Sequence, residues 1–131
     1  MDSGTYCLII KLDKPRTIQI GKLGRGFFPD GYYVYVGSAL HGLAKRIARH
    51  LSRKKKKHWH IDYLLECAGM IGTRKIYSVD KRECALSREV GNICQGIPML
   101  GFGSSDCRCT THLYFFPDNP LSNPLFERIW V

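Results

Sequence analysis

Five residues spread along the chain have side chains suited to chemistry on a phosphate ester: Tyr6, Tyr35, Arg46, His50 and Glu83. A fixed cation such as Arg46 would stabilise the negative charge that builds on phosphate oxygens in a transition state, by about 3 kcal/mol. A tyrosine can position or deprotonate a water, but its ordinary pKa of about 10 means that it needs a nearby cation to become a useful base. A carboxylate such as Glu83 could hold one divalent cation that keeps several of its waters.

Arg46 and His50 are predicted to lie on one helix that follows residues 31–37. Apolar side chains recur at helical spacing over residues 40–51, and Ser38 is available as the N-cap. The apolar stripe of this helix is centred near three residues: Leu40, Ile47 and Leu51.

Within that helix the side chains of Arg46 and His50 are four residues apart, so they lie side by side on one edge of the stripe, next to Leu43. Lys45 and Arg49 are predicted to point away from the stripe toward solvent. Arg46 and His50 can therefore lean over a neighbouring sheet. Taken without the tyrosines, Arg46 would more often be an ordinary solvated helix residue.

The two tyrosines are predicted on two strands. Residues 4–12 are apolar on both faces, which suits the centre of a covered sheet. Residues 31–37 are dense in β-branched and aromatic side chains and are bounded by glycines. Side chains alternate along a strand, so Tyr33 and Tyr35 share one face and Tyr32 lies on the other. The competing interpretation is that Tyr6 and Tyr35 are ordinary strand aromatics.

Glu83 is predicted on a third helix that Asp80 caps and that runs to about Ile93. It projects within about 20° of Val90, on the buried stripe, where a carboxylate is costly unless something pairs with it. A metal ion is one such partner. The spacing of Asp80 and Glu83 also suits a capping box, in which Glu83 reaches back to the helix N-terminus. The residues alone leave both interpretations open, and Glu89 is the second choice as a metal ligand.

The remaining elements complete a single domain over residues 1–131. Residues 17–20 could form a short strand that leads into a loop, and a final strand is expected over 112–116. Further predictions are a helix over 60–68 that stops at Gly69, a strand over 74–79, a loop over 101–109, and a surface-wrapping tail over 117–131 in which Phe126, Ile129 and Trp130 dock. The fold class is therefore α/β or α+β, with a small mixed or antiparallel central sheet flanked by helices.

The order of the short motifs resembles that of the GIY-YIG nuclease family. Residues 4–6 read GTY, residues 35–37 read YVG, and Arg46 follows nine residues after Gly37. The closest resemblance is to the Uri-like branch, carried by HWHIDYLL (58–65), ECALSREV (83–90) and GFGSSDCRCTTHLYFF (101–116). Two features depart from the family pattern: Thr5 stands at the usual isoleucine, and residues 13–30 form an inserted excursion between the two tripeptides.

The resemblance implies a metal-dependent endonuclease that hydrolyses nucleic-acid phosphodiester bonds, with DNA favoured over RNA and DNA repair as one setting. Glu83 would hold Mg²⁺ or Mn²⁺, and Tyr6 would assist deprotonation of the attacking water. Tyr35 would orient the site, Arg46 would stabilise the pentacovalent phosphate, and His50 would support the phosphate or the water.

The charge of the chain agrees with a polyanionic partner. Lys and Arg number 20 against 11 Asp and Glu, a net charge of +9, and cations that neutralise phosphates release condensed counterions. Charge alone does not separate DNA from RNA or from an anionic membrane. The residues predicted to contact nucleic acid are Arg53, Lys54, Lys55, Lys56, Lys57, His58, His60, Ser104 and Ser105. The alternatives are a solvated helix end, two surface histidines beside a buried Trp59, and a tight loop over 101–106.

The chain has six cysteines without a repeated C-x-x-C pattern, so no disulfide or zinc framework is evident. The N-terminus lacks a signal pattern and its apolar stretch is too short to cross a bilayer, so we expect a cytoplasmic protein with reduced thiols. Cys107, Cys109 and His112 could supply three zinc ligands, with Cys94 or Asp106 as a fourth, although such spacing is more typical of buried thiols. Two alternative functions follow: a noncatalytic nucleic-acid-binding module, or a zinc-stabilised interaction protein.

Overall fold

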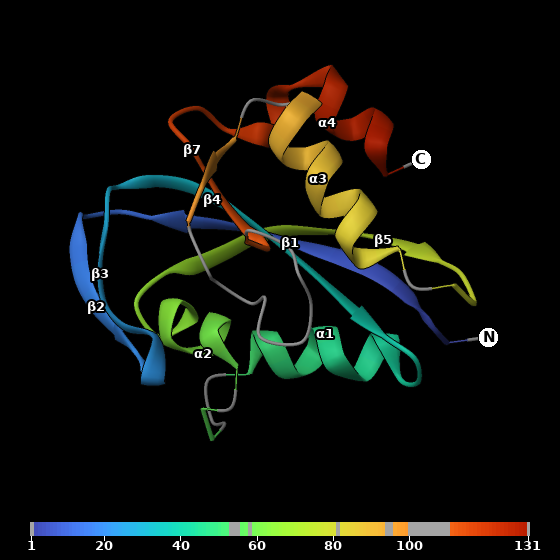
Figure 1. Ribbon diagram of the computed structural model, residues 1–131, viewed down its shortest axis with the longest axis horizontal. Coiled ribbons are helices and arrows are strands. Elements are labelled where there is room, and N and C mark those ends of the chain that lie inside the picture. Colours follow the sequence, from blue (N-terminus) through green and yellow to red (C-terminus); the bar gives the residue numbers. More distant parts are fainter. Residues whose placement is uncertain are drawn as a thin grey trace.

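The computed structural model describes residues 2–52, 56–57, 59–80, 82–93, 96–99 and 111–130, with the backbone alone at position 93. It is an α+β fold, as predicted, in which α1 and α2 cover one face of a five-stranded antiparallel sheet and α3 and α4 cover the other (Figure 1). The sheet order is β5-β1-β4-β7-β6. The elements are β1 (Gly4–Leu12), β2 (Arg16–Ile20), β3 (Gly24–Phe28), β4 (Gly31–Ala39), α1 (Leu43–Leu51), α2 (His60–Leu65), β5 (Gly69–Tyr77), α3 (Glu83–Ile93), β6 (Ile97–Pro98), β7 (Leu113–Phe116) and α4 (Pro124–Ile129), with 3-10 turns at Gly21–Leu23 and Pro120–Ser122.

The strand β1 is buried on both faces, as its apolar sequence predicts. Tyr6 and Leu8 point into the core beneath α1 and α2, whereas Cys7 and Ile9 point into the core beneath α3 and α4. This alternation is the period of two that a strand imposes. β1 and β4 therefore contribute side chains to two separate cores, one on each face of the sheet.

Two glycines allow β1 and β4 to bring their tyrosines to one place. Tyr6 lies opposite Gly37 in the antiparallel register, and a Cβ atom on Gly37 would come within 2.6 Å of the Tyr6 hydroxyl. A Cβ atom on Gly4 would collide with the backbone carbonyl of Ile76 in β5. Gly37 is thus required by close packing against Tyr6, and Gly4 by the close approach of the β5 backbone.

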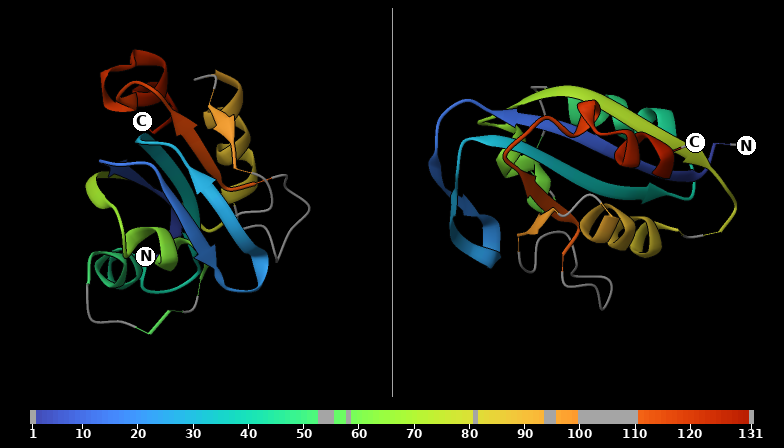
Figure 2. Two further views of the ribbon diagram at one scale, coloured as in Figure 1. Left: turned by 90° about the vertical axis from the view of Figure 1, so that its left-hand side faces the viewer. Right: turned by 90° about the horizontal axis from the view of Figure 1, so that it is seen from above.

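The segment between the tripeptides forms a β-hairpin instead of one short strand and a loop. β2 and β3 pair antiparallel over residues 16–20 and 24–28, and the hairpin extends beyond the end of the sheet farthest from the N-terminus (Figures 1 and 2). Its inward side chains, including Ile18, Ile20 and Phe28, join the core beneath α2. The prediction of an inserted excursion is confirmed. The second strand of the hairpin, β3, was not predicted, because its basic, glycine-rich composition is not typical of a strand.

The first helix begins later than predicted. Gly42, with φ +67°, occupies its N-cap position, while Ser38 lies inside β4 and is not the cap. Leu40 and Leu51 are exposed, and His50 is buried together with Leu43 and Ile47. The buried stripe is therefore rotated relative to the prediction, because His50 is a core residue that a count of apolar side chains does not include.

Other element boundaries also differ. The predicted helix over 60–68 ends at Leu65, and Gly69 begins β5 instead of stopping the helix. α3 starts at Glu83, so Asp80 is not its N-cap. The short strand β6 and the helix α4 were not predicted.

The C-terminal segment packs against the second core. Phe126, Ile129 and Trp130 are buried there, as predicted for the tail. The side chain of Asn123 caps α4 by accepting a hydrogen bond from the backbone N–H of Leu125 at 2.9 Å. None of the helices in the described part of the chain is long and apolar enough to span a membrane.

Candidate active site

Tyr6 and His50 form the buried centre of the site on the α1 face. The Tyr6 hydroxyl lies 2.7 Å from Nε2 of His50, and Tyr6 is only 2% exposed. The ring of Tyr35 stands edge-on to His50, with 6.2 Å between ring centroids. Tyr6 thus contacts His50, and Tyr35 lies beside the same imidazole. Three of the predicted residues therefore come together from β1, β4 and α1.

Trp59 adds an aromatic platform that the sequence analysis did not place in the site. Its ring centroid lies 5.7 Å from that of His50, and the guanidinium groups of Arg46 and Arg49 lie 5.0 and 4.4 Å from it. A flat cation over an aromatic face is held by the ring quadrupole. Trp59 therefore positions both arginines, and the only hint of this in the sequence was its place between two histidines.

Arg49 is not directed to solvent as predicted. Both of its terminal nitrogens donate to the carboxylate of Asp62 at 3.1 Å, and the Asp62 side chain is fully buried. Asp62 also accepts a hydrogen bond from the backbone N–H of Trp59 at 2.9 Å. This ion pair joins α1 to the start of α2 and holds Trp59 in place.

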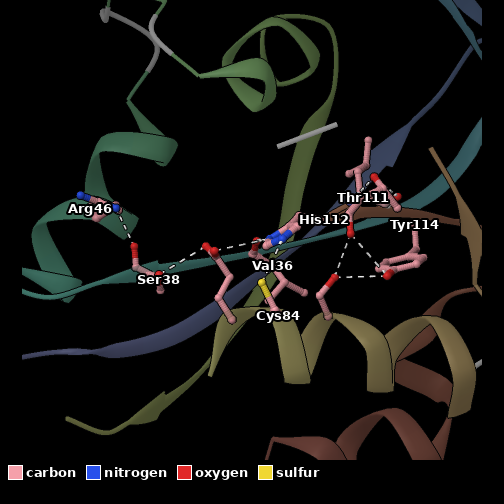
Figure 3. Close-up of polar contacts among 10 residues, drawn as sticks. Val36, Ser38, Arg46, Cys84, Thr111, His112 and Tyr114 are labelled. Atoms are coloured by element: carbon pink, nitrogen blue, oxygen red, sulfur yellow. Dashed lines mark hydrogen bonds and ion pairs between the residues drawn. The ribbon is translucent and has the colours of Figure 1, made fainter. Parts of the chain in front are cut away.

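Arg46 and Glu83 meet through Ser38 near the end of β4. Nη1 of Arg46 donates to the Ser38 carbonyl at 2.6 Å, and the Ser38 hydroxyl donates to Oε1 of Glu83 at 3.3 Å. Because Ser38 points its carbonyl and its side chain in different directions, it connects the α1 face to the α3 face. Figure 3 shows Ser38 between Arg46 on one side and His112 on the other.

Burial is the main cause that raises the pKa of Tyr6 well above its ordinary value. Tyr35 adds to the shift, the charge of Arg46 opposes it, and the carboxylate of Glu83 adds a smaller part. Arg46 alone does not bring the pKa of Tyr6 toward neutrality.

Glu83 lies on the side of α3 that faces the sheet, and its carboxylate is 29% exposed. Its Oε2 is 3.7 Å from Nδ1 of His112, and Cys84 lies beside the same histidine. One ligand atom from each of Glu83, Cys84 and His112 lies within 4.8 Å of the others. This is a group that could hold a metal ion, whereas Glu89, the second choice, is exposed. The capping box with Asp80 does not account for the position of Glu83, because the carboxylate faces Ser38 and His112.

Many of the residues predicted to contact nucleic acid lie outside the described part of the chain: Arg53, Lys54, Lys55, His58, Ser104 and Ser105. Lys57 is exposed and forms an ion pair with Glu66 at 2.9 Å. The carbonyl of Lys56 accepts a hydrogen bond from Arg49 at 2.9 Å. His60 is partly buried, which lowers its pKa below the ordinary value.

The zinc set predicted from the sequence is only partly described. Cys94, Asp106, Cys107 and Cys109 fall outside the described residues. His112 is fully buried, and its described neighbour is Cys84, which the sequence analysis had not assigned. Cys84 is next to Glu83 in the sequence, but no spacing pattern connects it to His112.

The sequence profile of the DUF123 family, a domain of unknown function, matches residues 5–129. The chain belongs to the DUF123 family. The match spans both faces of the sheet and includes all five residues predicted to be catalytic. No curated protein and no solved structure matches this DUF123 chain.

Proposed function

We propose that this DUF123 domain is an endonuclease of the GIY-YIG kind that hydrolyses nucleic-acid phosphodiester bonds, preferentially in DNA, with a divalent cation. The observation that carries the proposal is the bridge at Ser38. It joins Arg46 to Glu83 beside the Tyr6–His50 pair, so a phosphate-binding cation, a carboxylate and a proton acceptor meet near one end of β4. These are the residue types that the motif resemblance implies, and they come from four different elements.

Arg46 is the group that would stabilise the phosphate. One of its five N–H donors is used by the Ser38 carbonyl, and the stacking on Trp59 fixes the plane of the guanidinium. The remaining donors can bind phosphate oxygens without reorganisation of the side chain. A preorganised donor of this kind contributes about 3 kcal/mol to a transition state in which charge builds on oxygen.

Tyr6 and His50 would accept the proton of the attacking water together. Burial disfavours a free tyrosinate, so Tyr6 alone is a poor base. In the tautomer with the lone pair on Nε2, His50 takes the hydroxyl proton of Tyr6 as the hydroxyl oxygen accepts one from water. Gly37 has no side chain, which leaves the space that the Tyr6 hydroxyl occupies, and the ring of Tyr35 stands edge-on to the imidazole.

Glu83 and Ser38 supply oxygen ligands for the cation. A half-buried carboxylate beside a hydroxyl suits a hard divalent ion such as Mg²⁺ or Mn²⁺. A cation bound there would stabilise the leaving oxygen of the phosphodiester.

The test is a cleavage assay with single- and double-stranded DNA and RNA, with Mg²⁺, with Mn²⁺ and with a chelator. The wild type should cleave DNA only in the presence of a metal. Glu83→Gln and Arg46→Ala should each lower the rate about 100- to 1000-fold. Lys45→Ala is the matched control, since Lys45 is exposed on the same helix, and its rate should stay within about twofold.

Two results would count against the proposal. Equal cleavage by the wild type and Glu83→Gln would remove Glu83 from the mechanism. Binding of DNA that weakens with salt, without cleavage under any condition, would identify a noncatalytic nucleic-acid-binding module.

A further inference from the structure

The imidazole of His112 is held in one tautomer. Its Nδ1 lies 3.2 Å from the backbone carbonyl of Val36, and a carbonyl oxygen can only accept, so Nδ1 carries the proton. The proton-free Nε2 then points at Sγ of Cys84, 3.8 Å away (Figure 3). Metal-binding histidines are commonly oriented in this way, because the ring nitrogen that does not bind the metal donates its N–H to a carboxylate, a backbone carbonyl or a water.

The separation of the two atoms suits an ion between them. Zinc binds thiolate at about 2.3 Å and imidazole at about 2.0–2.1 Å, so two such ligands at a tetrahedral angle stand about 3.6 Å apart. The observed 3.8 Å requires only a small adjustment. A simple S–H to Nε2 hydrogen bond would also fit this distance, and the experiment below separates the two.

Glu83 provides a third ligand and a negative charge. Its carboxylate lies in the same cluster within 4.8 Å, one residue before Cys84 at the first turn of α3. The side chain is 29% exposed, so it can turn toward an ion without leaving a buried cavity. Glu83 and Cys84 therefore approach His112 from the same helix, α3.

The segment that carries His112 is fixed before any ion binds. The backbone N–H of Val36 donates to the His112 carbonyl at 3.0 Å, and the hydroxyl of Ser87 donates to the Thr111 carbonyl at 3.1 Å. Thr111 in turn donates its hydroxyl to the carbonyl of Met99. A rigid supporting shell is the condition under which a metal site binds tightly.

We propose that Cys84, His112 and Glu83 form a binding site for one borderline transition-metal ion of the Zn²⁺ class. Thiolate and imidazole ligands select such ions over Mg²⁺, which prefers oxygen alone. Glu83, Cys84 and His112 are three ligands from the described part of the chain, and a tetrahedral Zn²⁺ takes four. The inference shares Glu83 with the proposed function, in which the same carboxylate binds Mg²⁺ or Mn²⁺, so the two kinds of ion would compete for it. Metal binding is measured without nucleic acid, so the two proposals can fail separately.

Co²⁺ is the probe, because a cobalt ion bound to thiolate shows a sulfur-to-metal charge-transfer absorption. The chelator-treated full-length chain, titrated with Co²⁺, should develop this band at one equivalent, and Zn²⁺ should abolish it by displacement. Cys84→Ser should lose the band and weaken Co²⁺ binding by more than the about 10- to 100-fold loss that follows when a group hydrogen-bonded to a ligand is changed. Cys67→Ala is the matched control, since Cys67 is a partly buried free thiol in the other core.

Zn²⁺ should also raise the melting temperature of the wild type and of Cys67→Ala but not of Cys84→Ser, because a ligand stabilises only a native state that binds it. Glu83→Gln should keep the band and bind Co²⁺ more weakly. A band that persists in Cys84→Ser, or that disappears only when Cys107 and Cys109 are replaced, would overturn the assignment. So would the absence of any thiolate band in the wild type, which would leave the S–H hydrogen bond as the whole explanation.

Discussion

The two faces of the five-stranded sheet share β1 and β4 but hold their polar groups in different ways. On the α1 face, Arg46, Arg49 and His50 surround the ring of Trp59, and Arg49 pairs with a fully buried Asp62. On the α3 face, a carboxylate and a thiol gather around the imidazole of His112, and a more exposed ion pair joins Arg74 of β5 to Glu127 of α4. The first face is rich in cations and rings, and the second in metal-ligand types.

In the proposed function the two faces have different roles, and Ser38 connects them. Cations and a proton acceptor on one side suit the phosphate and the attacking water. Ligand atoms on the other side suit an ion. Because Ser38, which connects the two sides, belongs to β4, a change in the packing of either core should shift the end of β4.

The largest expected difference between the faces concerns their two arginine–carboxylate pairs. Asp62→Asn should lower the free energy of unfolding by about 3 kcal/mol, because it breaks a pair whose carboxylate is 0% exposed and leaves Arg49 facing a neutral amide. Glu127→Gln should cost about 0–1 kcal/mol, although both nitrogens of Arg74 contact Glu127 at 3.0 and 3.2 Å, since these side chains are 36% and 42% exposed.

Urea denaturation of both variants and the wild type measures this contrast. Asp62→Asn should also release Trp59, which would change the near-ultraviolet circular dichroism, whereas Glu127→Gln should leave that spectrum unchanged. Equal losses of stability in the two variants would show that burial does not distinguish the pairs.

The α1 face was the easier of the two to predict from the sequence. The strands around Tyr6 and Tyr35 follow from side-chain alternation and β-branched composition, which are local properties. Arg46 was correctly placed toward the sheet. His50 was also correctly placed toward the sheet, but its full burial was not predicted, because it depends on the Tyr6 hydroxyl, a partner 44 residues away that hydropathy cannot reveal.

The α3 face depends on contacts between residues far apart in the chain. Cys84 and His112 are 28 residues apart, and His112 and Val36 are 76 apart. Only the pairing of β7 with β4 brings them together. Glu83 was assigned by its position on the helix and by the family resemblance, but its neighbour Cys84 shows no spacing signal, so the ligand group could not be predicted without the sheet order.

A smaller effect should follow from adding one methyl group on the α1 face. Gly37→Ala would place a Cβ atom 2.6 Å from the Tyr6 ring and hydroxyl, so Tyr6 or β4 must shift. Overpacking of this kind costs about 1–3 kcal/mol. Chemical denaturation should show that loss, and DNA cleavage should fall with it because the Tyr6–His50 contact is displaced.

Gly69→Ala is the control for that variant. Gly69 also lies in a strand of the sheet, and among the described residues no atom beyond its chain neighbours lies within 4 Å of the position its Cβ would take. Neither glycine has a positive φ, so the comparison isolates packing from backbone strain. A stability of Gly37→Ala equal to that of Gly69→Ala would mean that Tyr6 is not tightly confined.

The smallest effect compares two neighbours in β1 that point into opposite cores. Burial raises the pKa of both Cys7 and Tyr6 well above their ordinary values of about 8.5 and 10. Above those values the unfolded chain loses a proton that the folded chain keeps, so the unfolding free energy falls as pH rises. Each group should contribute a slope of about 1.4 kcal/mol per pH unit, present for Cys7 from about pH 8.5 and for Tyr6 from about pH 10.

Cys7→Val and Tyr6→Phe should each remove one of these slopes, which urea titrations between pH 7 and pH 11 can resolve. The curve of Cys7→Val should depart from that of the wild type at a lower pH than the curve of Tyr6→Phe. If both variants kept the full alkaline slope, Cys7 and Tyr6 would ionise in the folded protein as readily as in the unfolded chain. If only Tyr6→Phe kept it, that would hold for Tyr6 alone, which would make Tyr6 a base in its own right.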